Sequence, residues 1–413
     1  MDAWPGGLAR IASDRRWFWL EAFLLVAVGM ALALALRPEP FSDWLYYWRA
    51  AQDLGRYERG GAMLLLVSLL RQLQWPPHAT MLLLNIPAAL AILFVSRRID
   101  PTRGKWLSHV VAGYLLLLTP YYGLVQLDLL AAACLVAAWV LLLGTPDRAA
   151  GGWRPALAML AIAAAVSTRP QFLLVLLALA LLVALVWGFA RKGTHRGTAM
   201  LLAVLVAGVL SGFLLDSGLR AHAERSGALR TNSAVTLYSG LLASSSSYPG
   251  CGHWSEAATQ AMRSDLGKPL ADAVFDRLES RSVSHWGAVM ACKSRYIVAP
   301  PAFAWGWLYT SPGAEVRLQE ASPAIVPRVG TGEAWANRLL ILAVYLSALL
   351  TAVRYARSDM LAWLPVAWMA AFWAVHLVFE VQGRYFLSML LLVPVLCALV
   401  MGRHRRDDGA AAT

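Results

Sequence analysis

The sequence predicts an all-α integral membrane protein with about ten transmembrane helices. Of its 413 residues, 59% are hydrophobic and only 15% are charged, whereas soluble domains carry closer to a quarter of charged residues. Several apolar runs reach the length of about 20 residues that a helix needs to cross a bilayer core. The first run, residues 17–36, contains Glu21 and is followed by "RPEP". Because no small-residue cleavage site follows, we interpret it as a retained membrane anchor.

The net charge of +12 is distributed in a way that indicates a membrane topology. Basic residues stand in short clusters between the apolar runs: Arg10, Arg15 and Arg16; Arg97, Arg98, Arg103 and Lys105; Arg148 and Arg154; Arg191, Lys192 and Arg196; Arg354 and Arg357; Arg403, Arg405 and Arg406. Short basic loops on alternate helix ends follow the positive-inside rule. This distribution argues against a nucleic-acid-binding surface.

The basic clusters and the apolar runs together define the expected spans. These are residues 17–36, 79–96, 106–120, 122–144, 155–168, 171–190, 198–216, 335–353, 360–379 and 385–402. An even number of spans places both termini in the cytoplasm. The expected outer segments are 37–78, 119–123, 167–172, 217–334 and 380–385. Three parts follow: an N-terminal membrane module (1–216), an extracytoplasmic cap (217–334) and C-terminal helices with a basic tail (335–413).

The first outer segment contains "PFSDWLYYWRAAQDLGRYERGG", residues 40–61. Its spacing predicts an interfacial helix that Ser42 or Asp43 caps and Gly55 ends. The expected buried face consists of Tyr47, Ala50, Ala51 and Leu54, and Trp44 and Trp48 suit the headgroup level. Residues 61–74 predict a second interfacial or re-entrant helix, because they are apolar but short.

Ionisable residues in or beside the spans gather at the outer face. They are Asp43, Asp128, Arg169, Asp216, Glu380 and Arg384. Such residues usually face a cavity or one another. Each also has a structural explanation: Asp43 as a helix cap, Asp128 as an ion-pair partner of Arg169, and Glu380 with Arg384 as a helical pair four residues apart. Their shared location favours a site that opens outward.

The sequence indicates no metal and no cofactor. His376 and Glu380 can share a helix face, but two ligands do not make a metal site. No glycine-rich phosphate loop or nucleotide fingerprint is present. Cys251 and Cys292 share the long outer segment, where a disulfide between them is possible but not required.

Four short segments resemble the GT-C superfamily of integral-membrane glycosyltransferases. They are "SDWLYYWRAAQDLG" (42–55), "QLDLLAAACLVAAWVLLL" (126–143), "TRPQFLL" (168–174) and "FEVQGRYFLSMLLLVPVL" (379–396). The chain is most similar to bacterial relatives of the protein O-mannosyltransferase and aminoarabinose transferase group, which are glycosyltransferase family 39-like. It departs from them in carrying one acid, Asp43, where many members carry two. It also lacks the Asp-any-Asp arrangement of metal-dependent oligosaccharyltransferases, so we expect metal-independent chemistry.

This resemblance implies a GT-C-like bundle in the inner membrane, with its active site on the extracytoplasmic side. It implies inverting transfer of a sugar from a polyprenyl-phosphate donor to a hydroxyl of a lipid, glycan or protein acceptor. Asp43 is then the general base. The implied substrate and donor-binding residues are Asp128, Arg169, Glu380, Arg384, Tyr385, Tyr46, Tyr47 and Lys293. Among them the cations would stabilise the departing lipid phosphate.

Two other functions fit the sequence. A flippase or transporter for lipid-linked sugars requires a polar path through the bundle, and the inner halves of the spans show little of one. An O-antigen polymerase or ligase would rely on outer-loop arginines such as Arg281 and Arg295 and not on a first-loop acid.

Overall fold

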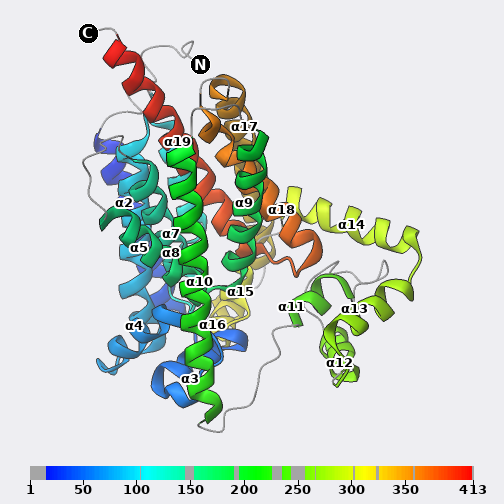
Figure 1. Cartoon of the computed structure of the whole chain (residues 1–413). Coiled ribbons are helices and arrows are strands. Elements are labelled where there is room, and N and C mark those ends of the chain that lie inside the picture. The colour runs from blue at the N-terminus through cyan, green and yellow to red at the C-terminus, as the bar shows by residue number, and fades with distance from the viewer. Residues whose placement is uncertain are drawn as a thin grey trace.

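The computed structural model describes residues 15–102, 104–144, 153–189, 195–225, 235–242, 256–265, 267–300, 303–321, 325–356 and 359–411. Throughout these ranges the regular secondary structure is helical, and no strand occurs in them. Long helices run side by side in a bundle, and shorter helices gather at one of its ends (Figure 1). The prediction of an all-α protein is confirmed.

The helices follow one another in three groups. The first group is α2 (Arg15–Leu36), α3 (Ser42–Gln52), η1 (Leu54–Arg56), α4 (Gly61–Arg71), α5 (Pro77–Ile99), α6 (Trp106–Leu117), η2 (Thr119–Tyr121), α7 (Asp128–Leu143), α8 (Trp153–Thr168), α9 (Pro170–Phe189) and α10 (His195–Arg225). The second is α11 (Val235–Leu237), η3 (Tyr238–Leu242), α12 (Glu256–Ser264), α13 (Leu270–Glu279), α14 (Val283–Val298), α15 (Ala304–Tyr309) and α16 (Pro312–Ala321). The third is α17 (Ile325–Tyr355), η4 (Met360–Trp363), α18 (Leu364–Val378), η5 (Gly383–Tyr385) and α19 (Phe386–Ala411).

Six helical segments within the described residues are long and apolar enough to cross a membrane, so the chain is an integral membrane protein. They comprise α2, α5, α10, α17, η4 with α18, and η5 with α19. The other four predicted spans correspond to the shorter apolar helices α6, α7, α8 and α9. Helix α4 is also short and apolar, as the sequence predicted for residues 61–74.

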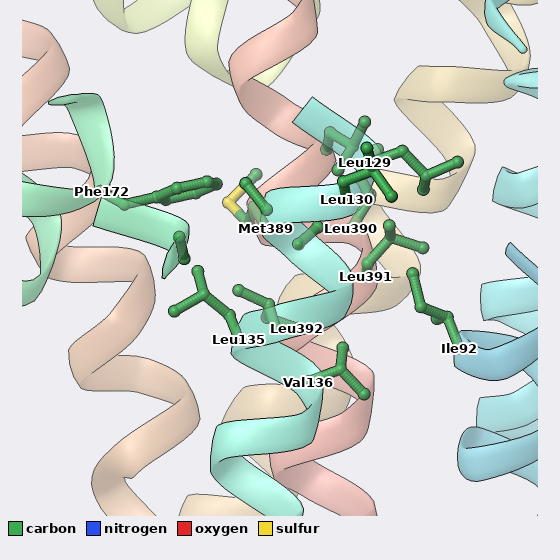
Figure 2. Close-up of a cluster of buried hydrophobic side chains, with 14 of the residues drawn as sticks. Ile92, Leu129, Leu130, Leu135, Val136, Phe172, Met389, Leu390, Leu391 and Leu392 are labelled. Carbon is green, nitrogen blue, oxygen red and sulfur yellow. The ribbon is translucent and has the colours of Figure 1, made fainter. Parts of the chain in front are cut away.

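Helix α19 is the centre of the bundle. Within its most apolar window 89% of the residues are buried, compared with 17% for α2 at the periphery. Helix α19 packs against α5, α6, α7, α17 and α18. Figure 2 shows how Met389 to Leu392 of α19 meet Leu135 and Val136 of α7, Phe172 of α9 and Ile92 of α5. A helix buried on all sides is apolar around its whole circumference, as residues 386–402 of α19 are.

The two ends of the bundle differ. The start of α2 and the far end of α19 lie at one end, and α3, α4 and α16 lie at the other (Figure 1); we call the latter the α3 end. Helix α3 packs on α4 and buries Tyr47, Ala50 and Ala51, which confirms most of its predicted face. Trp44 is also buried, with 1% of its surface exposed, so its assignment to the lipid headgroup level was wrong.

Helix α14 leads away from the bundle, with α12 and α13 at its outer end (Figure 1). The inner part of α14 packs against α18. Cys292 on this helix is disulfide-bonded, and Cys251 lies outside the described residues. Among the described residues between α10 and α17, η3 and α14 pack against α18, α15 packs against η2 and α17, and α16 packs against α2.

Candidate functional site

Asp43 is in the first turn of α3, but its carboxylate does not cap the helix. The N-cap residue is Phe41, and no side chain accepts a capping hydrogen bond there. Instead Asp43 Oδ2 accepts a hydrogen bond of 3.0 Å from Arg384 Nη2, and Oδ1 lies 2.8 Å from Arg59 Nη2. The prediction that Ser42 or Asp43 caps α3 was therefore wrong. The two guanidinium groups attract the carboxylate more strongly than neutral backbone N–H groups do.

The end of α3 also differs from the sequence prediction. The helix ends at Gln52, and Asp53 follows as its C-cap. Asp53 then accepts a hydrogen bond from the N–H of Gly55 and so starts the short helix η1. Gly55 therefore lies inside the next element and does not end α3.

Arg59 reaches Asp43 because the loop before α4 is tightly built. The hydroxyl of Tyr57 donates to Asp216 at the end of the bundle and accepts a 3.0 Å hydrogen bond from the N–H of Gly61. Gly60 and Gly61 both have positive φ, at 118° and 49°, which glycine adopts without a steric penalty. The loop therefore places Arg59 beside Asp43 through tertiary contacts.

A second ion pair lies in the same cluster. Arg169 Nη2 donates to Asp128 Oδ2, and Arg169 Nη1 donates to the hydroxyl of Tyr47 at 2.5 Å. Tyr121 donates a 3.2 Å hydrogen bond to the same carboxylate oxygen of Asp128. Asp128 and Arg169 expose only 1% and 5% of their side chains. The predicted pairing of these two residues is confirmed.

Aromatic rings cover one side of the Asp43–Arg384 pair. Trp44 of α3 and Trp307 of α15 are tilted against each other with centroids 4.8 Å apart. Phe41 and Tyr121 contact Trp44 edge-on. The Arg384 guanidinium lies 5.8 Å from the Trp307 ring centroid. These rings exclude water from one side of the ion pair, where electrostatic interactions are correspondingly stronger.

The electrostatic balance at Asp43 keeps its carboxylate ionised. Burial by itself would raise the pKa of Asp43, but the charges of Arg384 and Arg59 lower this pKa well below its usual range. For Arg59 the effect of burial has the opposite sign and lowers the pKa. The neighbouring Tyr47 and Asp43 outweigh this effect of burial, so the pKa of Arg59 is raised. Asp43 and Arg59 are therefore both charged at neutral pH.

Several N–H groups of these arginines are buried without a partner among the described residues. They are Nε and Nη1 of Arg384, Nε of Arg59 and Nε of Arg169. Buried donors that lack an acceptor are costly and uncommon in folded proteins. Asp43 keeps 28% of its side chain exposed, so the cluster is accessible from the surface of the protein. The arrangement is suited to bind an anion together with a hydroxyl group.

The remaining sequence candidates occupy distinct positions around this cluster. Tyr46 is 40% exposed, and the Arg59 guanidinium lies 5.9 Å from its ring centroid. Tyr385 is buried, and its ring lies 5.6 Å from the Arg384 guanidinium. Glu380 accepts a hydrogen bond from Gln382. Residues 380–382 are not helical, so Glu380 and Arg384 do not have the helical spacing that suggests an ordinary ion pair.

Lys293 faces a different direction. Its ammonium donates to the backbone oxygens of Gly240 at 2.6 Å and Phe379 at 2.9 Å. The side chain is fully buried between η3 and the end of α18. Burial lowers the pKa of Lys293 to about 7, against the opposing charge of Glu380. The structure thus places Lys293 against the backbone that precedes Arg384.

The sequence suggested that most buried charges lie at the α3 end. Asp100 is an exception. Asp100 is 1% exposed and accepts hydrogen bonds from the N–H groups of Thr102 and Ser108 at the opposite end of the bundle. Its contacts are those of a loop that joins two helices, and they explain Asp100 without a functional role.

Sequence reasoning overlooked Arg59 and Trp307. Arg59 stands in "YERGG" (57–61), where the paired glycines were the available signal of a constrained loop. Trp307 lies in α15, 263 residues after Trp44 by their numbers, and no local pattern connects the two. Within the described residues no group of three or more His, Cys, Asp or Glu side chains forms a possible metal site.

Comparison with known proteins yields one structural similarity. No family model matches the sequence, and no curated protein matches it. A solved structure that aligns with this chain is the archaeal oligosaccharyltransferase AglB from Archaeoglobus fulgidus, in complex with an inhibitory peptide and a dolichol-phosphate. The TM-score is 0.44 and the sequence identity 11%, over 96% of this chain and 52% of that chain. The chain thus spans about half the length of the archaeal enzyme.

Proposed function

We propose that this chain is a GT-C-type membrane glycosyltransferase that transfers a sugar from a polyprenyl-phosphate donor to an acceptor hydroxyl. The observation that supports this proposal is the position of Asp43 between Arg59 and Arg384, at one end of a membrane-spanning bundle. A carboxylate beside cations with unpartnered N–H groups combines a proton acceptor with an anion-binding site. A sugar phosphate attached to a lipid presents the matching groups at the membrane surface.

The proposed reaction is a single displacement. The acceptor oxygen attacks the anomeric carbon of the donor sugar and forms the new glycosidic bond. The bond between that carbon and the phosphate oxygen breaks, and its electron pair remains on the departing polyprenyl phosphate. The acceptor proton passes to the Asp43 carboxylate. Attack from the face opposite the leaving group inverts the anomeric configuration.

The arginines have two roles in this proposal. Arg384 and Arg59 stabilise the negative charge that develops on the leaving phosphate. They also make Asp43 a weak base while both hold its carboxylate, because they lower its pKa. Binding of the donor phosphate draws guanidinium N–H groups away from Asp43 and adds a nearby negative charge. Both effects raise the proton affinity of Asp43 when the acceptor is present.

The neighbouring residues would position the sugar. Asp128 and Arg169 form a buried pair whose remaining polar atoms can bind sugar hydroxyls. Tyr47 is held by Arg169, and the more exposed Tyr46 offers a ring to a sugar face or a prenyl chain. Tyr385 and Glu380 belong to the turn that carries Arg384 and would contact the donor. No metal is needed for this chemistry.

The proposal also assigns an orientation. The α3 end faces the extracytoplasmic side of the inner membrane, where lipid-linked donors replace nucleotide sugars, and both chain termini face the cytoplasm. Residues 1–216 form the membrane module that holds the first catalytic segment (37–78), and residues 217–334 cover the site. Residues 335–413 contribute the central helix and a basic cytoplasmic tail.

The decisive test is substitution of Asp43 in purified protein. We expect Asp43→Asn to lose at least about a hundredfold in transfer from a polyprenyl-phosphate sugar, since general-base groups contribute roughly 10²- to 10⁴-fold. Asp272→Asn, an exposed change in α13, is the matched control and should retain full activity. The product is measured by mass spectrometry of the glycosylated acceptor, with circular dichroism as a check of folding. Full activity of folded Asp43→Asn protein would exclude Asp43 as the base.

A further inference from the structure

The outer segment holds the turn that carries Arg384 at several points. The N–H of Glu380 donates a 2.8 Å hydrogen bond to the backbone oxygen of Thr236. Lys293 of α14 joins the same two segments, since it donates to Gly240 on one side and to Phe379 on the other. The turn between α18 and η5 is therefore fixed to residues 236–240 and to α14, which are remote in sequence.

The contact between Gly240 and the turn leaves no space for a side chain. A Cβ at Gly240 would lie 2.1 Å from the carbonyl carbon of Phe379 and 2.4 Å from the nitrogen of Glu380. Two backbone segments approach this closely only where one residue is glycine. Lys293 lies over this close approach and satisfies one carbonyl oxygen from each segment, so the three residues form a compact clasp (Gly240, Lys293 and Phe379).

Residues 380–383 connect Phe379 of the clasp to Arg384. His376 Nδ1 lies 2.9 Å from the backbone oxygen of Glu380, and the His376 ring stacks on Tyr385 at 5.1 Å. A Cβ at Gly383 would lie 2.6 Å from the Cβ of Phe303. The short turn from Phe379 to Arg384 is thus packed along its length.

Burial of the Lys293 ammonium group is energetically unfavourable. Its side chain is fully buried and its two hydrogen-bond acceptors are neutral carbonyl oxygens. An ammonium group is costly to bury unless it is well paired. An apolar side chain of similar length would fill the same space at lower cost, although it would leave the two carbonyls unpaired.

We propose that Lys293 is a positioning residue: through the clasp it holds the Phe379–Arg384 turn so that the Arg384 guanidinium faces Asp43. The proposal rests on the proposed function for the role of Arg384, and it replaces the expectation that Lys293 binds the donor phosphate directly. It implies that the anion site is complete only when residues 236–240 and α14 are docked on α18.

A double-substitution cycle separates positioning from direct binding. The probe is undecaprenyl phosphate in detergent, and its dissociation constant is measured for wild type, Lys293→Met, Arg384→Gln and the double variant. Loss of a charge-assisted hydrogen bond predicts about tenfold to a hundredfold weaker binding for Lys293→Met. If Lys293 acts through Arg384, the double variant binds no more weakly than Arg384→Gln alone. Independent, multiplying losses would overturn the proposal, because a direct phosphate ligand or a purely structural residue would give them.

Hydrogen exchange tests the same idea without any ligand. We expect Lys293→Met and Gly240→Ala to accelerate amide exchange in residues 379–386 and also in residues 42–52, which contact the turn through Arg384. In an Arg384→Gln background neither change should further affect residues 42–52. Lys268→Met, an exposed change in the same outer segment, is the control. Unchanged exchange in residues 42–52 would refute the positioning role of Lys293, whether or not undecaprenyl phosphate binds. Failure of undecaprenyl phosphate to bind to the wild type would instead count against the proposed function.

Discussion

Replacing Asp128 by Asn should destabilise the folded protein strongly, because it leaves the Arg169 charge buried without its counter-ion. Arg169 exposes 5% of its side chain and donates to Asp128 and to Tyr47. Asparagine keeps the shape of aspartate and can still accept one hydrogen bond, but it removes the negative charge.

The expected magnitude follows from the burial of the pair. Breaking a buried ion pair by removing one partner typically costs about 3–5 kcal/mol of unfolding free energy. The hydrogen bond that Asn retains places Asp128→Asn near the lower value, at about 3 kcal/mol. Arg169→Gln should cost a similar amount, since it leaves the Asp128 carboxylate unpaired. The double variant should lose less than the sum of the two single losses, because it contains neither buried charge.

The assay is equilibrium unfolding in mixed detergent micelles as the SDS fraction is increased, followed by tryptophan fluorescence. The chain contains 18 tryptophans, so its intrinsic signal is sufficient. Lys268→Gln removes one partner of an ion pair whose side chains are 50% and 60% exposed, and this control should leave the unfolding transition unchanged. If Asp128→Asn unfolds at the same SDS fraction as wild type, the reasoning that buried pairing stabilises this end of the bundle is wrong.

Three further outcomes are expected. Gly61→Ala should destabilise the protein and reduce activity, because its Cβ would lie 2.4 Å from the backbone of α8 at a φ of 49°. The control is Gly113→Ala, whose Cβ would meet nothing within 4 Å. Thermal unfolding measures the stability of both variants. Because burial lowers the pKa of Lys293 to about 7 and an unfolded lysine titrates near about 10.4, the unfolded state binds more protons between these values. Stability should therefore rise from pH 7 to pH 9 in wild type, and Lys293→Met should weaken this rise. Glu333→Gln should accelerate amide exchange in α15. The carboxylate of Glu333 accepts the N–H of Trp305 at 2.9 Å, and the amide nitrogen of glutamine cannot accept that hydrogen bond. Unchanged exchange in α15 would contradict this role of Glu333.

The sequence predicted the features that depend on local pattern. Hydrophobic run length predicted the apolar helices, and the spacing of Tyr47, Ala50 and Ala51 predicted the buried face of α3. The pairing of Asp128 with Arg169 could also be predicted, since both residues stand at the same ends of adjacent expected spans. A charge at a membrane boundary can pair with few other groups at the same depth, so the topology alone limited the possible partners of Asp128.

Only the tertiary structure decided which partners the remaining polar groups have. Asp43 pairs with Arg384, 341 residues away in the chain, and with Arg59 from a loop shaped by two glycines. Lys293 donates to the backbone oxygens of Gly240 and Phe379, because η3 and the end of α18 converge on it. Periodicity determines which face of a helix is buried, since that depends only on neighbours along the chain. The partner of a buried charge depends on how distant segments pack, and helical spacing does not contain that information.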